Sequence, residues 1–109
     1  MNAKTVENWD YAIGTSLKGY ITTTRAELVK AFGSPTYEAL DGDKTSIEWV
    51  VQFDDGTIAT IYDYKREGSG YYGEEGYLLS DNEEYDFHIG GADNTNAVEL
   101  VTQAVKEGK

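Results

Sequence analysis

The alternation of hydrophobic and polar residues is clearest between residues 47 and 65. In residues 47–53 (IEWVVQF), Ile47, Trp49, Val51 and Phe53 fall on one face at a period of two, which is typical of a half-buried strand. The Asp-Gly pair at residues 55–56 suits a type I′ turn, and residues 58–65 alternate again, with Ile58, Thr60, Tyr62 and Tyr64 opposite Ala59 and Ile61. We predict a hairpin over residues 47–65 at the centre of a sheet.

Two shorter segments show the same alternation. Residues 17–22 fit a short strand, and residues 85–89 place Asp86 and His88 on one face and Phe87 and Ile89 on the other. Gly90-Gly91 is expected to end this second strand. With the hairpin, these segments predict a mainly antiparallel sheet.

Helical signals come before and after these strands. Thr24 and Glu27 form a capping box, and Gly33 followed by Pro35 ends a helix over residues 25–32. A second helix over about residues 95–107 carries an apolar stripe formed by Ala97, Val98, Val101, Ala104 and Val105. The predicted fold is an α+β single domain over residues 1–109, with both helices on the face of Trp49, Val51 and Phe53.

Two segments carry weaker patterns. Residues 1–16 are interpreted as an N-terminal arm in which Trp9, Tyr11 and Ile13 alternate. Residues 66–83 form a long loop rich in Gly, Tyr and Glu, with a short strand at residues 77–79 left open. Long loops in compact domains are usually functional or disordered.

Charge narrows the choice of partners. The chain has 20 acidic and 9 basic residues among 109, a net charge of −11. Because burying unpaired charge is costly, most carboxylates must lie on the surface. Their field repels nucleic acid and anionic membranes and attracts basic proteins. We therefore expect a basic protein partner, no direct contact with nucleic acid or membrane, and a monomer or homodimer.

Other composition features exclude several classes of site. The absence of cysteine rules out disulfides and thiolate metal ligands, and no apolar run approaches the ~20 residues of a membrane helix. Residues 1–10 lack the basic and apolar regions of a signal peptide. These features agree with a cytoplasmic location.

The candidate partner-binding surface is the acidic, tyrosine-rich segment. Carboxylates grip arginines and lysines through charge-assisted hydrogen bonds, and tyrosine rings accept guanidinium groups on their faces. The simpler interpretation is a solvated loop that keeps the protein soluble. The predicted contact residues are Glu67, Tyr71, Tyr72, Glu74, Glu75, Tyr77, Glu83 and Glu84.

Three further motifs carry weaker signals. Residues 41–45 (DGDKT) resemble half of a calcium loop, but Gln52 stands where the loop needs its glutamate, so a surface turn is favoured. His88 is the lone histidine and is interpreted as structural or binding. Gly90-Gly91 before a helix could hold phosphate, and a simple strand-to-helix turn is the alternative.

No nucleophile motif occurs, so we predict no enzyme activity, no catalytic residue, no metal and no cofactor. The competing class is a hydrolase built on paired acids such as Glu83 and Glu84.

Two family resemblances bear on function. Residues 22–37 (TTTRAELVKAFGSPTY), 48–65 (EWVVQFDDGTIATIYDYK) and 87–91 (FHIGG) resemble small acidic accessory proteins of tailed bacteriophages. The short helix ending in Gly33-Ser34-Pro35, followed by a Trp-containing strand and a hairpin, is similar to the helix-hairpin unit of β-lactamase-inhibitor-type and small outer-membrane lipoprotein domains. The first resemblance implies an accessory product acting in the host cytoplasm. The second implies a helix-on-sheet module that works by binding.

The resulting hypothesis is a phage-type inhibitor that binds a host protein, most simply an antiviral defence factor, as a mimic of nucleic acid. The alternative is a sponge that sequesters a nucleotide immune signal. In the sponge, tyrosines would stack on the base, and the Gly90-Gly91 turn with Arg25, Lys65 or Arg66 would hold phosphate.

Overall fold

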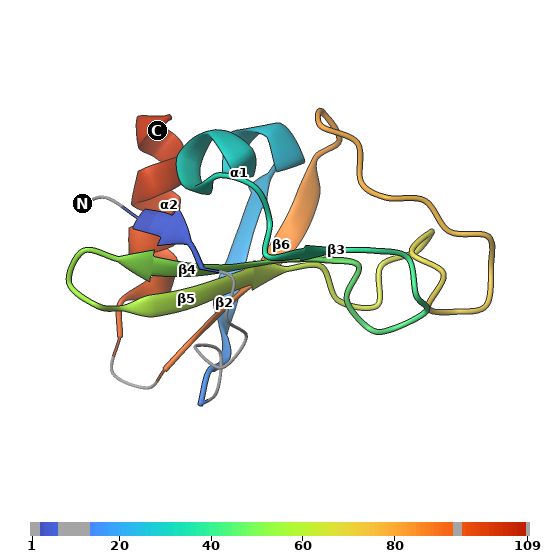
Figure 1. Ribbon diagram of the computed structural model, residues 1–109, viewed down its shortest axis with the longest axis horizontal. Helices are drawn as coiled ribbons and strands as arrows, with labels where there is room; N and C mark the ends of the chain where they lie inside the picture. The colour runs from blue at the N-terminus through green and yellow to red at the C-terminus, as the bar shows by residue number, and fades with distance from the viewer. Residues whose placement is uncertain (1–2, 7–13, 93–94, 109) are drawn as a thin grey trace.

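A computed structural model describes residues 3–6, 14–92 and 95–108 of the chain (Figure 1). Within these residues, six strands form one antiparallel sheet in the order β1-β4-β5-β6-β2, and β3 also pairs with β4. Two helices accompany the sheet, so the α+β class is confirmed. The elements are β1 (Ala3–Thr5), β2 (Ser16–Thr23), α1 (Arg25–Phe32), β3 (Tyr37–Glu38), β4 (Ile47–Phe53), β5 (Ile58–Tyr62), β6 (Tyr85–Gly91) and α2 (Ala97–Glu107).

Strands β4 and β5 are joined by a tight turn. Glu48 pairs with Tyr62 and Gln52 with Ile58, and the Phe53 N–H donates to the Thr57 carbonyl at 2.9 Å. Gly56 has a φ of +88°, a conformation that glycine adopts without steric cost. Strand β5 ends at Tyr62, whereas the sequence predicts that it continues to Lys65, although the Asp63 N–H still donates to the Ile47 carbonyl at 3.3 Å.

Both helices lie on the same side of the sheet (Figure 1). Helix α1 has the predicted bounds, and the Thr24 hydroxyl accepts from the Glu27 N–H at 3.2 Å. The reciprocal half of the capping box differs, because the Glu27 carboxylate accepts from the Thr23 hydroxyl instead. Helix α2 begins at Ala97, two residues later than predicted, with Asn96 as its N-cap.

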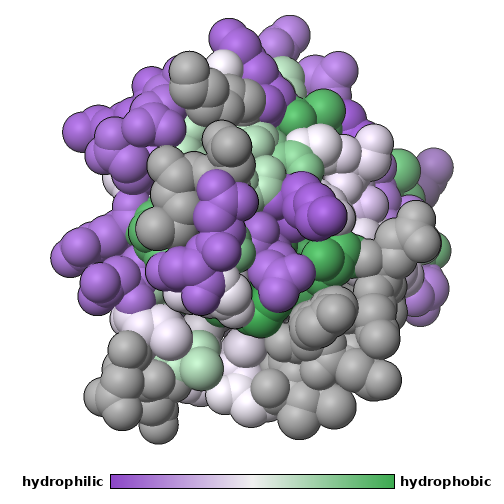
Figure 2. Space-filling model, turned by 60° about the vertical axis from the view of Figure 1, so that its left-hand side comes forward, coloured by the Kyte–Doolittle hydropathy of each residue, from purple (hydrophilic) through white to green (hydrophobic). Residues whose placement is uncertain are grey.

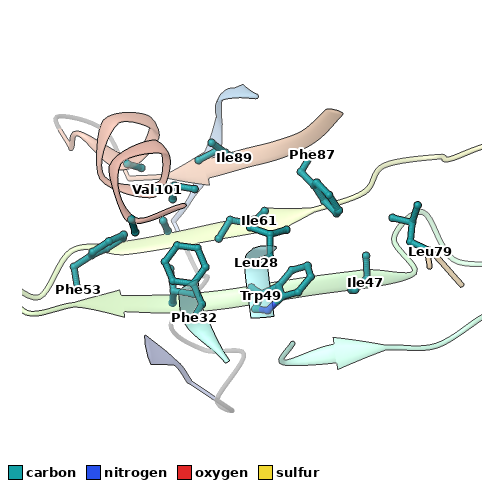
Figure 3. Close-up of a cluster of buried hydrophobic side chains, with 14 residues drawn as sticks. Leu28, Phe32, Ile47, Trp49, Phe53, Ile61, Leu79, Phe87, Ile89 and Val101 are labelled. Atoms are coloured by element: carbon teal, nitrogen blue, oxygen red, sulfur yellow. The ribbon is translucent and has the colours of Figure 1, made fainter. Parts of the chain in front are cut away.

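The core fills the space between the helices and the sheet (Figure 3). Trp49 and Phe87 are fully buried and meet edge to face, with ring centroids 6.0 Å apart. The Trp49 indole N–H donates to the Gly33 carbonyl at 2.9 Å, which ties β4 to the end of α1. Leu79, from the long loop, is also buried in this cluster. The face of β4 that alternation assigned to the core is therefore confirmed.

Three other expectations need correction. Gly90 and Gly91 are the last two paired residues of β6, so the strand ends at Gly91 and not at Ile89 as predicted. Glycine is needed at residue 90 because a Cβ there would lie 2.4 Å from the Thr60 hydroxyl. Residues 3–5 of the expected N-terminal arm form strand β1, paired with β4. Residues 77–79 form no strand. The predicted packing of Trp9, Tyr11 and Ile13 lies outside the described residues.

The surface of the molecule is mixed, because Leu17, Tyr20, Leu40 and Tyr72 are exposed beside many charged residues. Figure 2 shows one side of the molecule, on which hydrophobic residues appear only in small patches between hydrophilic ones. At one end of the sheet, two long loops project side by side, residues 39–46 and residues 63–84 (Figure 1). The second of these loops contains all the predicted contact residues, so this end of the molecule is the candidate site.

Candidate functional site

A buried ion pair holds the two projecting loops together. Arg66 Nε donates to Asp63 Oδ2 at 3.1 Å, and both side chains are almost fully buried. Asp63 Oδ1 accepts from the N–H groups of Ser46 and Ile47 at 2.7 and 3.2 Å. The Lys65 N–H also donates to the Lys44 carbonyl at 2.7 Å. Since a buried charge is tolerated only when it is paired and hydrogen-bonded, this network fixes the base of both loops.

Arg66 also organises the loop that follows it. Its Nη2 donates to the Tyr77 carbonyl at 2.5 Å, and its guanidinium lies 4.8 Å from the centroid of the Tyr77 ring. Gly68, with a φ of +83°, passes under that ring so closely that a Cβ would lie 2.1 Å from a ring carbon. Tyr77 is therefore part of the loop's internal packing, although 49% of its surface stays exposed.

The predicted contact residues fall into two groups on this loop. The Glu74 carboxylate accepts from the N–H groups of Gly68 and Gly70 at 3.1 and 3.2 Å, so it shapes the loop itself. Hydrogen bonds from backbone N–H groups, its own first, lower the pKa of Glu74. Glu67, Glu75 and Glu84 are exposed, Glu83 is half-buried, and the rings of Tyr71 and Tyr72 meet edge to face at 5.0 Å. Glu67, Tyr72 and Glu74 line an open hollow of about 410 Å³.

The structure adds a second acidic segment that the sequence pattern does not connect with this loop. Asp41 and Asp43 belong to the neighbouring loop of residues 39–46, and Glu38 is the last residue of β3, directly before it. The Tyr37 hydroxyl donates to the Asp41 carboxylate, which raises the pKa of Tyr37 to about 12. Arg25 bridges the two segments, with Glu38 at 2.8 Å and Asp81 at 2.9 Å. We call residues 38–44 and 67–84 together the acidic end.

A row of aromatic and ionisable side chains crosses the sheet on the face opposite the helices. In register, Tyr37 pairs with Glu48, Glu48 with Tyr62, Tyr62 with His88, and His88 with Tyr20. Directly paired residues share a face and lie close enough to interact. The centroid of the His88 ring lies 4.9 Å from that of Tyr20, 5.3 Å from that of Tyr62 and 5.6 Å from that of Tyr64.

The ionisable members of this row are poorly solvated. Burial raises the pKa of Glu48 to about 7, and the charge of Asp63 adds to this effect. Burial lowers the pKa of His88, against a smaller opposing effect of Asp63. His88 Nδ1 is buried without a hydrogen-bond partner. Period two placed His88 on the face opposite Phe87 and Ile89, but only the strand register reveals the neighbours of His88.

The structure changes the interpretation of the other candidate motifs. Residues 41–45 form a turn in which Asp41 accepts from the Asp43 N–H at 3.0 Å, and the described part of the chain contains no metal-binding group of three His, Cys, Asp or Glu. Gly90 and Gly91 pair within the sheet as the last residues of β6 rather than form a turn directly before α2, which begins at Ala97. Two of the cations proposed for the sponge, Arg25 and Arg66, are engaged by carboxylates.

Comparison with protein-family models and with curated proteins finds no match. None of the described helices is both long and apolar enough to cross a membrane.

Proposed function

We propose that the chain is a non-enzymatic inhibitor of the phage type, which binds a basic surface of a host protein through its acidic end. The observation that carries the proposal is the fixed position of two acidic loops side by side. Residues 38–44 contribute three carboxylates and residues 67–84 contribute six, and the second segment contains no Lys or Arg. The Arg66–Asp63 pair anchors both loops before a partner arrives, which reduces the entropy cost of binding.

A basic nucleic-acid-binding cleft is the partner surface that suits this end. Such clefts recognise closely spaced negative charges, and the carboxylates of the acidic end supply these in place of phosphates. Tyr71 and Tyr72 provide amphipathic rings beside the charges. The proposed target is therefore an antiviral defence factor of the host that handles nucleic acid, and the proposed place of action is the host cytoplasm.

The test compares two double variants that change the net charge equally. Glu67→Gln with Glu75→Gln removes two exposed carboxylates from the acidic end. Glu99→Gln with Glu107→Gln removes two exposed carboxylates from α2 and serves as the control. Immobilised protein is exposed to bacterial lysate at low and at high salt, with and without added duplex DNA.

We expect capture of a basic host protein that high salt or duplex DNA releases. The first pair should lower its affinity severalfold, and the α2 pair should leave it unchanged. A captured protein without a basic surface, capture that salt does not alter, or equal effects of the two pairs would contradict the proposal.

A further inference from the structure

Strand β2 forms one edge of the sheet. It is the last strand in the order β1-β4-β5-β6-β2, and among the described strands it pairs with β6 alone. Leu17 and Tyr20 of this strand keep 48% and 57% of their surfaces exposed. An edge strand presents unpaired backbone N–H and C=O groups, which can pair with another strand. The hydrogen bonds of the neighbouring strands determine which groups β2 presents.

Hydrogen bonding in β5 fixes the direction of the backbone groups in β6. Asp63, directly after β5, donates through its N–H to the Ile47 carbonyl of β4. Successive residues of an antiparallel strand bond to its two neighbours in turn, so the odd-numbered residues of β5 bond to β4 and the even-numbered ones to β6. Tyr62 pairs with His88. The even-numbered residues of β6 therefore bond to β5, and its odd-numbered residues bond to β2.

The outward-facing backbone groups of β2 are those of Tyr20 and Thr22. Phe87 of β6 pairs with Ile21, so Ile21 bonds to β6 and the N–H and C=O groups of its two neighbours point away from the sheet. In the described part of the chain, neither neighbour forms a backbone hydrogen bond with another segment. These groups are available to a strand that approaches the edge.

This edge has no carboxylate of its own. Residues 11–26 contain no Asp or Glu, although the chain has 20 acidic residues among 109. Lys18 and the register shift beside it interrupt the start of the edge, as such features do in many edge strands, whereas residues 19–23 pair without interruption. The net charge of −11 opposes contact between two copies of the chain, and that opposition is weak where the contacting strand lacks carboxylates.

We propose that β2 pairs with β2 of a second copy of this chain, so that one antiparallel sheet runs through a homodimer. With a twofold axis beside Ile21, Tyr20 of each copy lies opposite Thr22 of the other, and each of these residues donates to and accepts from its counterpart. Lys18 then lies opposite Thr24 of the second copy rather than opposite another lysine. A basic host protein is attracted to the acidic end instead, so the edge and the acidic end serve different partners.

Sedimentation equilibrium of the full chain over a wide range of protein concentration tests the dimer. Thr22→Pro removes an outward N–H without removing a bond to β6, and proline is tolerated at such edge positions. Thr22→Ala keeps the N–H and loses only the side-chain hydrogen bond to Asp86, so it is the matched control. We expect a reversible monomer–dimer equilibrium in the wild type. The dissociation constant should rise at least about tenfold for Thr22→Pro and stay close to that of the wild type for Thr22→Ala.

Two measurements on the wild type do not depend on the folding of a variant. Amide exchange at Tyr20 and Thr22 should slow as the protein concentration rises, because these N–H groups are bonded only in the dimer. Salt should strengthen the dimer, since it screens the repulsion between two copies of net charge −11. Salt should weaken the capture of a basic host protein, so the two kinds of association are distinguished by the sign of the salt effect.

A chain that stays monomeric at all concentrations, a dimer that Thr22→Pro does not weaken, or a dimer that salt dissociates would overturn the inference. Exchange at Tyr20 and Thr22 that does not depend on concentration would do the same. Protection of these amides only after a host protein is added would assign the edge to that protein and would also overturn the pairing of two copies.

Discussion

At the scale of single residues, the burial of the Glu48 carboxylate lowers the stability of the folded protein. Glu48 lies on the face of β4 opposite the helices, and burial raises the pKa of its carboxyl from 4.5 to about 7. The folded protein therefore binds a proton more tightly than the unfolded chain, and stability falls as the pH rises from about 4.5 to about 7. Since one pKa unit corresponds to about 1.4 kcal/mol, the loss is at most about 3.5 kcal/mol.

Glu48→Gln should remove this loss. We expect the variant to be more stable than the wild type at pH 8 and about equally stable at pH 4.5, as measured by urea unfolding. His88, whose pKa is lowered, changes stability in the opposite sense and is present in both proteins, so the difference between them isolates Glu48. A difference that does not depend on pH would show that the Glu48 carboxyl has an ordinary pKa.

Arg66 is a single side chain on which a whole loop depends. Arg66→Gln would leave Asp63 charged and buried without its ion-pair partner, which typically costs about 3–5 kcal/mol. It would also remove the hydrogen bond to the Tyr77 carbonyl. We expect lower stability and faster amide exchange at Gly68 and Tyr77. A loss of global stability with normal protection of those two amides would contradict the role in the loop.

At the scale of elements, the alternation of hydrophobic and polar residues predicted which face of β4 is buried, because successive side chains of a strand point to opposite faces of the sheet. Trp49 is fully buried against Phe87 and bonded to Gly33. Trp49→Ala should therefore cost about 3–5 kcal/mol in the free energy of unfolding. Trp49→Phe keeps an aromatic ring and loses the indole hydrogen bond, so it should cost less.

Fluorescence provides an independent check on Trp49. With Trp9→Phe as the background, the emission of Trp49 should be blue-shifted in the folded protein and move to the red on unfolding. A mild loss of stability together with water-like emission would disprove the assignment of this face to the core.

Other features could not be predicted from local patterns. Gly90 and Gly91 read as a turn, but their role depends on Thr60 and Ala97, which approach from other elements. The Asp63–Arg66–Ser46 network joins residues up to 20 positions apart, and no periodicity marks it. The predicted contact segment was identifiable from its composition. The neighbouring acidic loop and the row through Glu48 and His88 required the strand register, which sequence alternation does not specify.

At the scale of the whole molecule, the acidic residues are unevenly distributed. The acidic end gathers carboxylates from two loops, whereas α2 carries Glu99 and Glu107 together with Lys106. Like charges on a compact chain repel one another and weaken the folded state. Salt screens this repulsion, with a Debye length of about 10 Å at 0.1 M and about 3 Å at 1 M. Stability should therefore depend on salt, and the dependence should originate mainly at the acidic end.

Thermal unfolding at increasing sodium chloride concentration measures this effect. We expect the melting temperature of the wild type to rise by roughly 5 °C between low and high salt. The variant with Glu67→Gln and Glu75→Gln should melt higher than the wild type at low salt and gain less from added salt. The variant with Glu99→Gln and Glu107→Gln has the same net charge but removes carboxylates that lie near Lys106, so its salt dependence should stay close to that of the wild type. If the two variants respond alike, the repulsion is spread over the surface rather than concentrated where the partner is proposed to bind.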